Sequence, residues 1–600
     1  MARRGLPSLL LLLLALVVVA CQTVQPAPPP TATPAPPSAD QVAASFFQTW
    51  QQGQYDRMYD LLSTQAQAST PRELFVRRYT NIHAGIGEVR LSVRQVGSTM
   101  TQSGTGSARV PFQVTRSLAV FGDLVETNEL PLVQENGQWT IDWQPGLIFR
   151  DLTATSSVRV NSDVAPRGRI VDRAGRPLAG DEPNAPRVYP LADAAAQVVG
   201  YLGHPTAEEL NRPELAGSED SDWIGRAGIE AAFEKRLAGE KGGSIVIVDQ
   251  AGGLVRTIAQ KAAQPGEDVQ LTLDADLQQQ AASALGDQIG SAIVMDPRDG
   301  SLLALVSRPS FDPNRFVAGL SDAEWQRLNG ESQPLVLRPT ESAYATGSTF
   351  KVITMAAGLE RGVVTPDDSF DCGLDWNGLP GVTLHNWQAQ GRLNLVEALT
   401  ESCNPAFYEI GLKLHTHDPA SLPGFARAFG LGQPTGVAGV PESVGKVPEP
   451  RNAGEAVNLA IGQGALLASP LQLANAYAAL ANGGTLRTPL LVQGAPQATR
   501  GALPISASTR ATIIEGMSRV TSTPRGTAAY AFQGERTPIA AKTGSAENEN
   551  PEAHAWFVGF ATPDQPRVLV LAMVEGGEHG GTVAAPVARK IIDYAIGRVR

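Results

Sequence analysis

Cysteine is scarce in this sequence. Only three occur among 600 residues, at positions 21, 372 and 403. A scaffold held together by many disulfides is therefore excluded. Cys372 and Cys403 allow at most one intrachain bridge. The sequence leaves open whether they form it or remain two free thiols, because it does not show their distance in space.

An excess of positive charge is also missing. The chain has 48 Lys and Arg against 59 Asp and Glu, which gives a formal net charge of -11. Because binding to phosphates needs a basic face, this composition argues against a nucleic-acid partner. The pair His415 and His417 has no convincing partner ligands. We therefore expect neither a metal nor any other cofactor.

The apolar run at residues 9–20 is too short for a clear membrane span. It follows Arg3 and Arg4 and ends at Cys21, a pattern that resembles a bacterial lipobox, where cleavage before the cysteine is coupled to lipidation of its thiol. We expect residues 1–20 to be a lipoprotein signal peptide and Cys21 to be the lipid anchor. An uncleaved anchor helix is the alternative. In either case the rest of the chain lies outside the cytoplasm, attached to the membrane.

A tract rich in Pro, Ala and Thr follows and predicts a semi-rigid tether over residues 21–38. The length of the chain then predicts about three to four domains. Residues 39–146 combine helix-spaced aromatic residues with later strand-like segments, such as 108–114 and 139–143. This pattern predicts two helices followed by a curved sheet, a cone-like α+β domain whose aromatic residues form the core.

Residues 147–275 alternate charged, glycine-rich turns with short apolar segments. We expect a structural role for these charges, one helical stretch from Gly225 to Gly239, and a strand at 269–273. From residue 276 onward the pattern changes to an amphipathic helix and then two apolar runs joined by Pro297-Arg298-Asp299-Gly300. The two runs predict a hairpin, and hence an antiparallel sheet in the C-terminal half.

Two Ser-x-x-Lys pairs occur, at Ser348/Lys351 and Ser443/Lys446. A serine becomes a strong nucleophile when a neighbouring base takes its proton, and lysine can be that base where a buried, cation-rich site lowers its pKa. Ser348 follows Gly347 and opens a run typical of a buried helix, which places its hydroxyl at a helix N-terminus. Ser443 lies among prolines and glycines, so we interpret that pair as a loop.

Two more motifs complete the set. Ser402-Cys403-Asn404 precedes Pro405, which suits a turn at a helix start. Lys542-Thr543-Gly544 follows a strand-like segment, where glycine allows a substrate backbone to approach the sheet edge. Ser-x-x-K, Ser-x-Asn and Lys-Thr-Gly in this order are the signature of penicillin-binding proteins and β-lactamases.

With these motifs the chain resembles a class B penicillin-binding protein that carries an N-terminal domain like that of the methicillin-resistance transpeptidase. The resemblance implies a multidomain α+β fold: the cone-like domain at 39–146, a pedestal or dimerisation domain at 147–275, and a serine transpeptidase domain at 276–600 with an antiparallel sheet flanked by helices. It also implies a peptidoglycan D,D-transpeptidase that cross-links stem peptides and is inhibited covalently by β-lactams.

The family's roles transfer to this sequence motif by motif. The resemblance implies that Ser348 is acylated by D-Ala-D-Ala and that Lys351 accepts its proton. Ser402 and Asn404 relay protons and hold the peptide amide, and Lys542 engages the carboxylate. Thr543, Gly544 and Ser545 bind substrate, with backbone N–H groups of Ser348 and Ser545 forming the oxyanion hole.

Alternatives remain within and outside this class of enzyme. A β-lactamase or D,D-carboxypeptidase of the same fold would use water as the acceptor, and Glu547 and Glu552 invite assignment as a deacylating base, although loop charges are the simpler interpretation. A non-catalytic penicillin sensor or division scaffold is the other alternative. The expected partners are peptidoglycan stem peptides, β-lactams as inhibitors, the membrane, and a glycosyltransferase of the wall machinery as a candidate.

Overall fold

The computed structural model describes residues 35–102, 104–182, 185–212, 215, 218–546 and 553–599. The signal peptide at 1–20, Cys21, the tether up to residue 34, Glu547 and Glu552 lie outside these residues. The chain divides into two compact units. The first contains the described residues up to Leu118 together with 123–158 and 247–256, and the second contains the rest. Within the described ranges, no helix is long and apolar enough to cross a membrane, and no cluster of His, Cys, Asp and Glu has the arrangement of a metal site.

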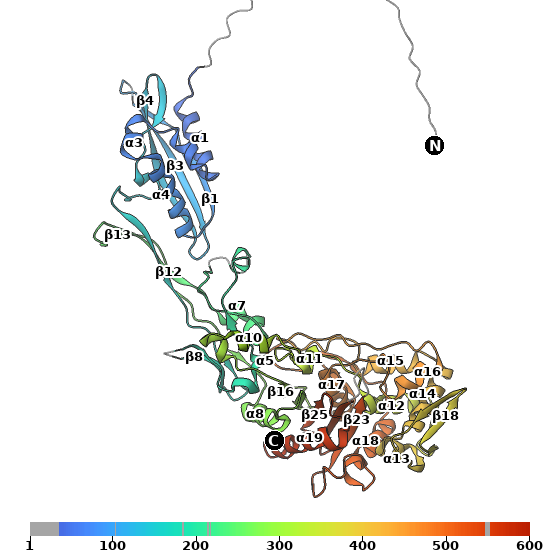
Figure 1. Cartoon of the computed structure of the whole chain (residues 1–600). Coiled ribbons are helices and arrows are strands. Elements are labelled where there is room, and N and C mark those ends of the chain that lie inside the picture. Colours follow the sequence, from blue (N-terminus) through green and yellow to red (C-terminus); the bar gives the residue numbers. More distant parts are fainter. Residues whose placement is uncertain are drawn as a thin grey trace, which may run out of the picture. The chain divides into compact units, whose positions relative to one another are not determined.

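The first unit has four helices before its sheet, not the two that the sequence predicted: α1 Ala39–Gln51, α2 Tyr55–Tyr59, α3 Thr64–Ser69 and α4 Arg72–Gly85. Figure 1 labels α1, α3 and α4 beside the strands of this unit. Helix α4 escaped the sequence pattern because it buries only Phe75 and Tyr79. The strands are β1 Glu88–Gln95, β2 Met100–Gln102, β3 Ser107–Leu118, β4 Gly122–Glu135 and β5 Gln138–Ile141, in the order β1-β3-β4-β5 with β2 on β3.

Aromatic residues form the core of this unit, as the sequence predicted. Trp50 packs edge-on against Tyr79 at a centroid distance of 5.4 Å, and Phe75 packs against Trp143 at 4.9 Å. Trp50 and Phe75 are fully buried. Rings of this size remove a large apolar area from water, and their edge-to-face geometry adds a specific attraction.

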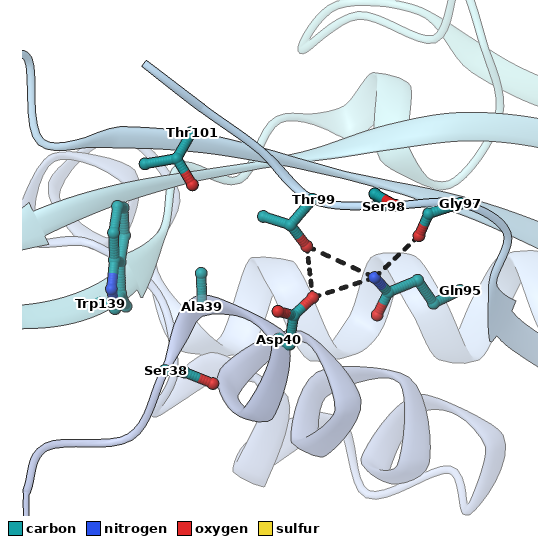
Figure 2. A pocket seen from close by; sticks show the side chains of 9 residues that line it. All are labelled: Ser38, Ala39, Asp40, Gln95, Gly97, Ser98, Thr99, Thr101 and Trp139. Carbon is teal, nitrogen blue, oxygen red and sulfur yellow. Dashed lines mark hydrogen bonds between the residues drawn. The ribbon is translucent and has the colours of Figure 1, made fainter. Parts of the chain in front are cut away.

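A cavity of about 690 Å³ opens on the surface of the first unit (Figure 2). Asp40 lies in it and accepts hydrogen bonds from Thr99 and from Gln95, at 2.9 Å for the latter. These bonds, the one from Thr99 first, hold the pKa of Asp40 below its usual range. Trp139 lines the same cavity. None of the motif residues of the sequence lies here.

Short strands and helices make up the region between the cone-like domain and residue 275. Strands β6 Ser157–Asp163, β12 Gly242–Val248 and β13 Leu254–Lys261 form one sheet, in the order β13-β12-β6. A second sheet has the order β14-β7-β8-β9, made of Val269–Gln270, Ile170–Val171, Pro177–Glu182 and Ala185–Val188. Two predictions were too simple here. The strand predicted at 269–273 ends at Gln270, and only a single bridge from Leu271 to Val492 follows it. The predicted helical stretch is split into α6 Gly228–Ala232 and α7 Glu234–Leu237. The split occurs because Phe233, with φ -116° and ψ 24°, is not helical.

The charges of this region are structural, as expected. Arg187 and Glu230 are both fully buried, and their Nε and Oε1 atoms lie 2.7 Å apart. Arg167 adds a second cation, 2.8 Å from Glu230. Removing Glu230 would deprive the fully buried Arg187 of this carboxylate, and breaking a buried ion pair in this way is strongly destabilising.

A five-stranded antiparallel sheet organises the C-terminal half, in the order β16-β15-β25-β24-β23. Its strands are Leu302–Arg308, Gly290–Met295, Leu569–Val574, His554–Ala561 and Ile539–Ala546. The predicted hairpin is the pair β15 and β16. Helices α8 Ala275–Leu285 and α19 Ala585–Ile596 pack on one face, because Val294, Val570 and Phe557 share a buried cluster with them. Helix α17 Pro470–Ala481 covers the other face, in a cluster with Ile293 and Leu571.

Further helices of this half are α9 Asn314–Ala318, α10 Asp322–Leu328, α11 Arg338–Glu341, α12 Lys351–Glu360, α13 Leu395–Thr400, α14 Asn404–His417, α15 Ser421–Ala428, α16 Ala453–Ala460 and α18 Ala507–Ser522. Helices α12 to α16 and α18 contribute residues to the buried cluster on that second face. Two small hairpin-like sheets pair β17 Ser369–Cys372 with β20 Gly391–Asn394, and β18 Asp375–Leu379 with β19 Val382–His385. A disulfide between Cys372 and Cys403 ties β17 to the start of α14. Of the two possibilities that the sequence left open, the structure therefore has the bridge.

Candidate active site

Ser348 lies in a tight turn at the start of a buried helix. A 3-10 turn, Gly347–Phe350, leads directly into α12. Gly347 has a φ of +52° and donates its N–H to Gly462 O at 2.9 Å. A Cβ at this position would lie 2.5 Å from Ser545 O, so only glycine lets the turn approach strand β23 this closely. Ser348 is half-buried, and the N–H of Lys351 donates to its carbonyl.

Lys351 is fully buried one turn after Ser348. Its ammonium group donates to Ser402 O at 2.8 Å, to Ser402 Oγ at 3.2 Å and to Asn404 Oδ1 at 2.6 Å. Burial, and secondarily the nearby charge of Lys542, lowers the pKa of Lys351 well below its ordinary range. A shift in this direction favours the neutral form of lysine, which a general base requires.

Ser402 has an unusual backbone. Its φ of +57° places a buried, non-glycine residue in the left-handed region, at a cost of about 1–2 kcal/mol. In this conformation its carbonyl accepts from Lys351, and its hydroxyl accepts from both Lys351 and Lys542. Strain of this kind persists only where the surroundings over-determine it, and it clusters at functional sites.

Lys542 approaches Ser402 from the sheet. It is fully buried, and its Nζ donates to Ser402 Oγ and to Thr543 O, both at 2.9 Å. Burial lowers its pKa to about 7. Two buried lysine amino groups thus share one serine hydroxyl, and the charge of Lys542 disfavours protonation of Lys351.

Strand β23, which carries Lys542, lies at the edge of the sheet. Just before it, Thr562 N donates to Pro538 O at 2.8 Å, and the register with β24 is regular up to Ala546. Since bonded and unbonded positions alternate in an antiparallel ladder, Thr543 and Ser545 direct their backbone N–H and C=O groups to the open edge. Ser545 is exposed, and Gly544 packs so closely that a Cβ there would lie 3.0 Å from Thr346 O.

Comparison with known proteins decides the family. The model of the penicillin-binding protein transpeptidase domain matches residues 290–593, half of the chain. The chain belongs to the class B penicillin-binding proteins. Models of the penicillin-binding protein dimerisation domain and of the NTF2-like N-terminal transpeptidase domain match residues 182–271 and 38–156 of this penicillin-binding protein.

Relatives support the same placement. Peptidoglycan D,D-transpeptidase MrdA of Haemophilus influenzae is 32% identical over 68% of this chain and 69% of its own length. Penicillin-binding protein 3 of Bacillus subtilis is 26% identical over 90% of this chain and 93% of its own length. Among solved structures, Pseudomonas aeruginosa PBP2 in complex with WCK 5153 matches with a TM-score of 0.63 and 32% identity, covering 72% of this chain and 96% of that chain.

The structure of this penicillin-binding protein brings the predicted motif residues together. Lys351, Ser402, Asn404 and Lys542 are joined by the hydrogen bonds given above, and the turn of Ser348 packs against β23 at Gly347 and Gly544. The second Ser-x-x-Lys pair is elsewhere. Ser443 lies in a loop, where its N–H donates to Thr340 O at 2.7 Å, as the sequence interpretation expected.

Several supporting residues escaped the sequence analysis. Asn386 and Gln390 contact the backbone around Ser402. Tyr477 donates to Thr349 O at 2.7 Å, next to the nucleophile, and Thr527 shares a 2.6 Å hydrogen bond with Thr543. None belongs to a motif, and each meets its partner only through the fold. In a single sequence no local pattern marks them.

Proposed function

We propose that this class B penicillin-binding protein is a peptidoglycan D,D-transpeptidase whose nucleophile is Ser348. One observation carries the proposal: a buried lysine with a strongly lowered pKa follows Ser348 by one helical turn and is held by the Ser402–Asn404 turn. The match to enzymes named peptidoglycan D,D-transpeptidase supports the same activity.

Acylation follows from this geometry. Neutral Lys351 takes the proton of Ser348 Oγ as that oxygen attacks the carbonyl carbon of the penultimate D-alanine. The N–H groups of Ser348 and Ser545 stabilise the resulting oxyanion, and the outward direction of the Ser545 backbone supports this role. The carbon–nitrogen bond then breaks, and the terminal D-alanine leaves with a proton delivered through Lys351 and Ser402.

Deacylation reverses the same steps with a different amine. The amine of a neighbouring stem peptide attacks the ester, loses its proton to the Lys351–Ser402 pair and returns Ser348 to its free hydroxyl. In the carboxypeptidase or β-lactamase alternatives, water takes the place of this amine. Lys542 is fully buried against Ser402. We therefore assign it a charge effect on a bound carboxylate, with the exposed Ser545 and the strand edge of Thr543 and Gly544 as the contact surface.

The remaining assignments are part of the same proposal. We assign residues 1–20 to a signal peptide, 21–38 to the tether, 39–146 to the cone-like domain, 147–275 to the pedestal or dimerisation domain and 276–600 to the transpeptidase domain. Cys21 is the proposed lipid anchor on the outer face of the cytoplasmic membrane. A glycosyltransferase of the wall machinery is the proposed partner. A solved structure described as a peptidoglycan synthase complex that coordinates polymerization and crosslinking supports it, with 29% identity, a TM-score of 0.65 and coverage of 74% of this chain and 92% of that chain.

The test compares wild type, Ser348→Ala and Ser443→Ala as full-length proteins in detergent, labelled with a fluorescent penicillin. We expect stable labelling that only Ser348→Ala abolishes. Incubation with uncrosslinked glycan strands should then yield cross-linked dimers and free D-alanine by mass spectrometry. Release of D-alanine without dimers would identify a carboxypeptidase, rapid loss of label would identify a β-lactamase, and labelled Ser348→Ala would refute the assignment of the nucleophile.

A further inference from the structure

Helix α14, which carries Asn404, begins with a weak cap of its own. The first backbone N–H groups of a helix have no partner within it and need an external acceptor. Here Cys403 is the N-cap, and its sulfur, already bonded to Cys372, accepts from Ala406 N at 3.4 Å. Sulfur is a poor acceptor. Pro405 has no N–H, so the Asn404 N–H is the other donor of this first turn that needs an acceptor outside the helix.

Asn386 supplies the missing oxygen from a distant part of the chain. It follows β19, is only 7% exposed, and accepts the Asn404 N–H on Oδ1 at 3.1 Å. Its Nδ2 has three acceptors: Gln388 O at 2.7 Å, Gln390 Oε1 at 3.0 Å and Gly373 O at 3.2 Å. Because the two hydrogens of Nδ2 face only acceptors and Oδ1 faces an N–H, the amide has one orientation, with the oxygen directed at α14.

The loop of residues 386–390 also contacts the residue before Ser402. The carbonyl of Glu401 accepts from Gln390 Nε2 at 2.6 Å and from Trp387 Nε1 at 3.2 Å. Arg525 contacts both Gln390 and Glu401: its Nη2 lies 2.7 Å from Gln390 O and 2.7 Å from the Glu401 carboxylate. The left-handed Ser402 is therefore held between two backbone groups, Glu401 O and Asn404 N–H, that one loop fixes.

From these contacts we infer that Asn386 is a positioning residue for acylation: through the Asn404 N–H it sets the turn that presents Ser402 O and Asn404 Oδ1 to Lys351. The inference rests on the proposed function of Ser348 and Lys351. Asn386 touches no reacting atom in this scheme. The effect of Asn386 is to hold Lys351 Nζ where it can reach the nucleophile. Two acceptors of Lys351 Nζ, Ser402 O at 2.8 Å and Asn404 Oδ1 at 2.6 Å, belong to the turn that Asn386 fixes.

A positioning role and a purely structural role predict different kinetics. Loss of a positioning contact slows the chemical step in every molecule, because a displacement of about 1 Å near the reacting groups can cost a factor of about 100. Loss of a structural contact instead reduces the fraction of molecules that react. The acylation rate constant and the final amplitude of labelling separate these two effects.

The experiment measures acylation of full-length Asn386→Ala by a fluorescent penicillin under stopped-flow conditions. We expect the first-order acylation constant to fall by about 10- to 100-fold, with the non-covalent dissociation constant and the labelling amplitude close to wild type. Asn377→Ala, at an exposed position of the adjacent strand β18, is the matched control and should behave as wild type.

Other outcomes are equally informative. An unchanged acylation constant in folded Asn386→Ala, or a loss confined to amplitude, would overturn the inference while leaving Ser348 as the nucleophile. Labelling of Ser348→Ala would instead refute the proposed function itself. If Asn386→Ala fails to fold, Asn386→Ser serves in its place, since it keeps a polar group that is too short to reach Asn404.

Discussion

Lys542 Nζ lies 2.9 Å from Ser402 Oγ, although the two residues are 140 positions apart. Lys351 reaches the same hydroxyl at 3.2 Å. Neither amino group has a buried carboxylate partner among these contacts. Burial lowers the pKa of both lysines, and the charge of Lys542 lowers the pKa of Lys351 further. The lowered pKa of Lys351 favours the neutral amine that can act as a base.

Lys542→Met should move the acid limb of the acylation profile to higher pH. The charge of Lys542 lowers the pKa of Lys351, so its removal raises that pKa, and neutral Lys351 then requires a higher pH. The measurement is the pH dependence of penicillin acylation, judged by the position of the limb and not by the height of the plateau. Lys590→Met, at an exposed site on α19, is the control. A limb that stays in place or moves to lower pH would contradict the assignment of Lys351 as the titrating base.

The buried lysines should also make stability depend on pH. Lys542 has a folded pKa of about 7, below its unfolded value, so between pH 7 and about 10 the unfolded chain binds a proton that the folded chain does not. The free energy of unfolding should therefore rise with pH across this window, by about 1.4 kcal/mol per unit for one lysine.

Thermal melts of the transpeptidase region from pH 7 to 10 would check this dependence, with Lys542→Met beside wild type. The variant should show a shallower rise, because one titrating group is gone. Parallel slopes for the two proteins would show that Lys542 is charged in the folded state.

Gly347→Ala should abolish most acylation. The added Cβ would lie 2.5 Å from Ser545 O at a residue whose φ is +52°, so the Ser348 turn must move away from β23. Gly381→Ala is a matched control, because it also has a positive φ, +71°, but no atom within 4 Å of the new Cβ. We expect a loss of at least about 100-fold for the first variant and little change for the second, by labelling with a fluorescent penicillin. Equal effects would mean that backbone strain alone, and not the approach to Ser545, matters.

The Cys372–Cys403 bridge should resist alkylation until it is reduced. It closes a loop with a sequence separation of 31, and the chain-entropy model gives such a loop a stabilisation of about 3–4 kcal/mol. Without reductant, alkylation should add no mass at Cys372 or Cys403. After reduction, both residues should be alkylated and the mass should rise accordingly. Cys372→Ser should melt at a lower temperature than wild type. Modification of either thiol in the unreduced protein would show that the bridge is absent.

Much of the catalytic half could be predicted from local sequence. Three elements of the site have short-range signals. Glycine precedes a buried apolar run in the helix after Ser348, and proline stands in the first turn of the helix after Ser402. Small apolar residues lead into Lys-Thr-Gly in the strand of Lys542. The four helices of the first unit were harder, because α3 and α4 bury few side chains and their pattern is mostly polar.

By itself the sequence determined which residue types this protein has for acyl transfer, and whether each lies near a helix start, a turn or a strand, because hydrogen bonds within a turn or helix depend on near neighbours. Only the tertiary structure decided that Ser402 adopts a left-handed backbone, that burial lowers the pKa of Lys542, and that Asn386 caps the helix of Asn404. Each of these depends on contacts between segments that are 18 to 140 positions apart. Burial and a distant hydrogen-bond partner are properties of the packed chain, and no local pattern records them.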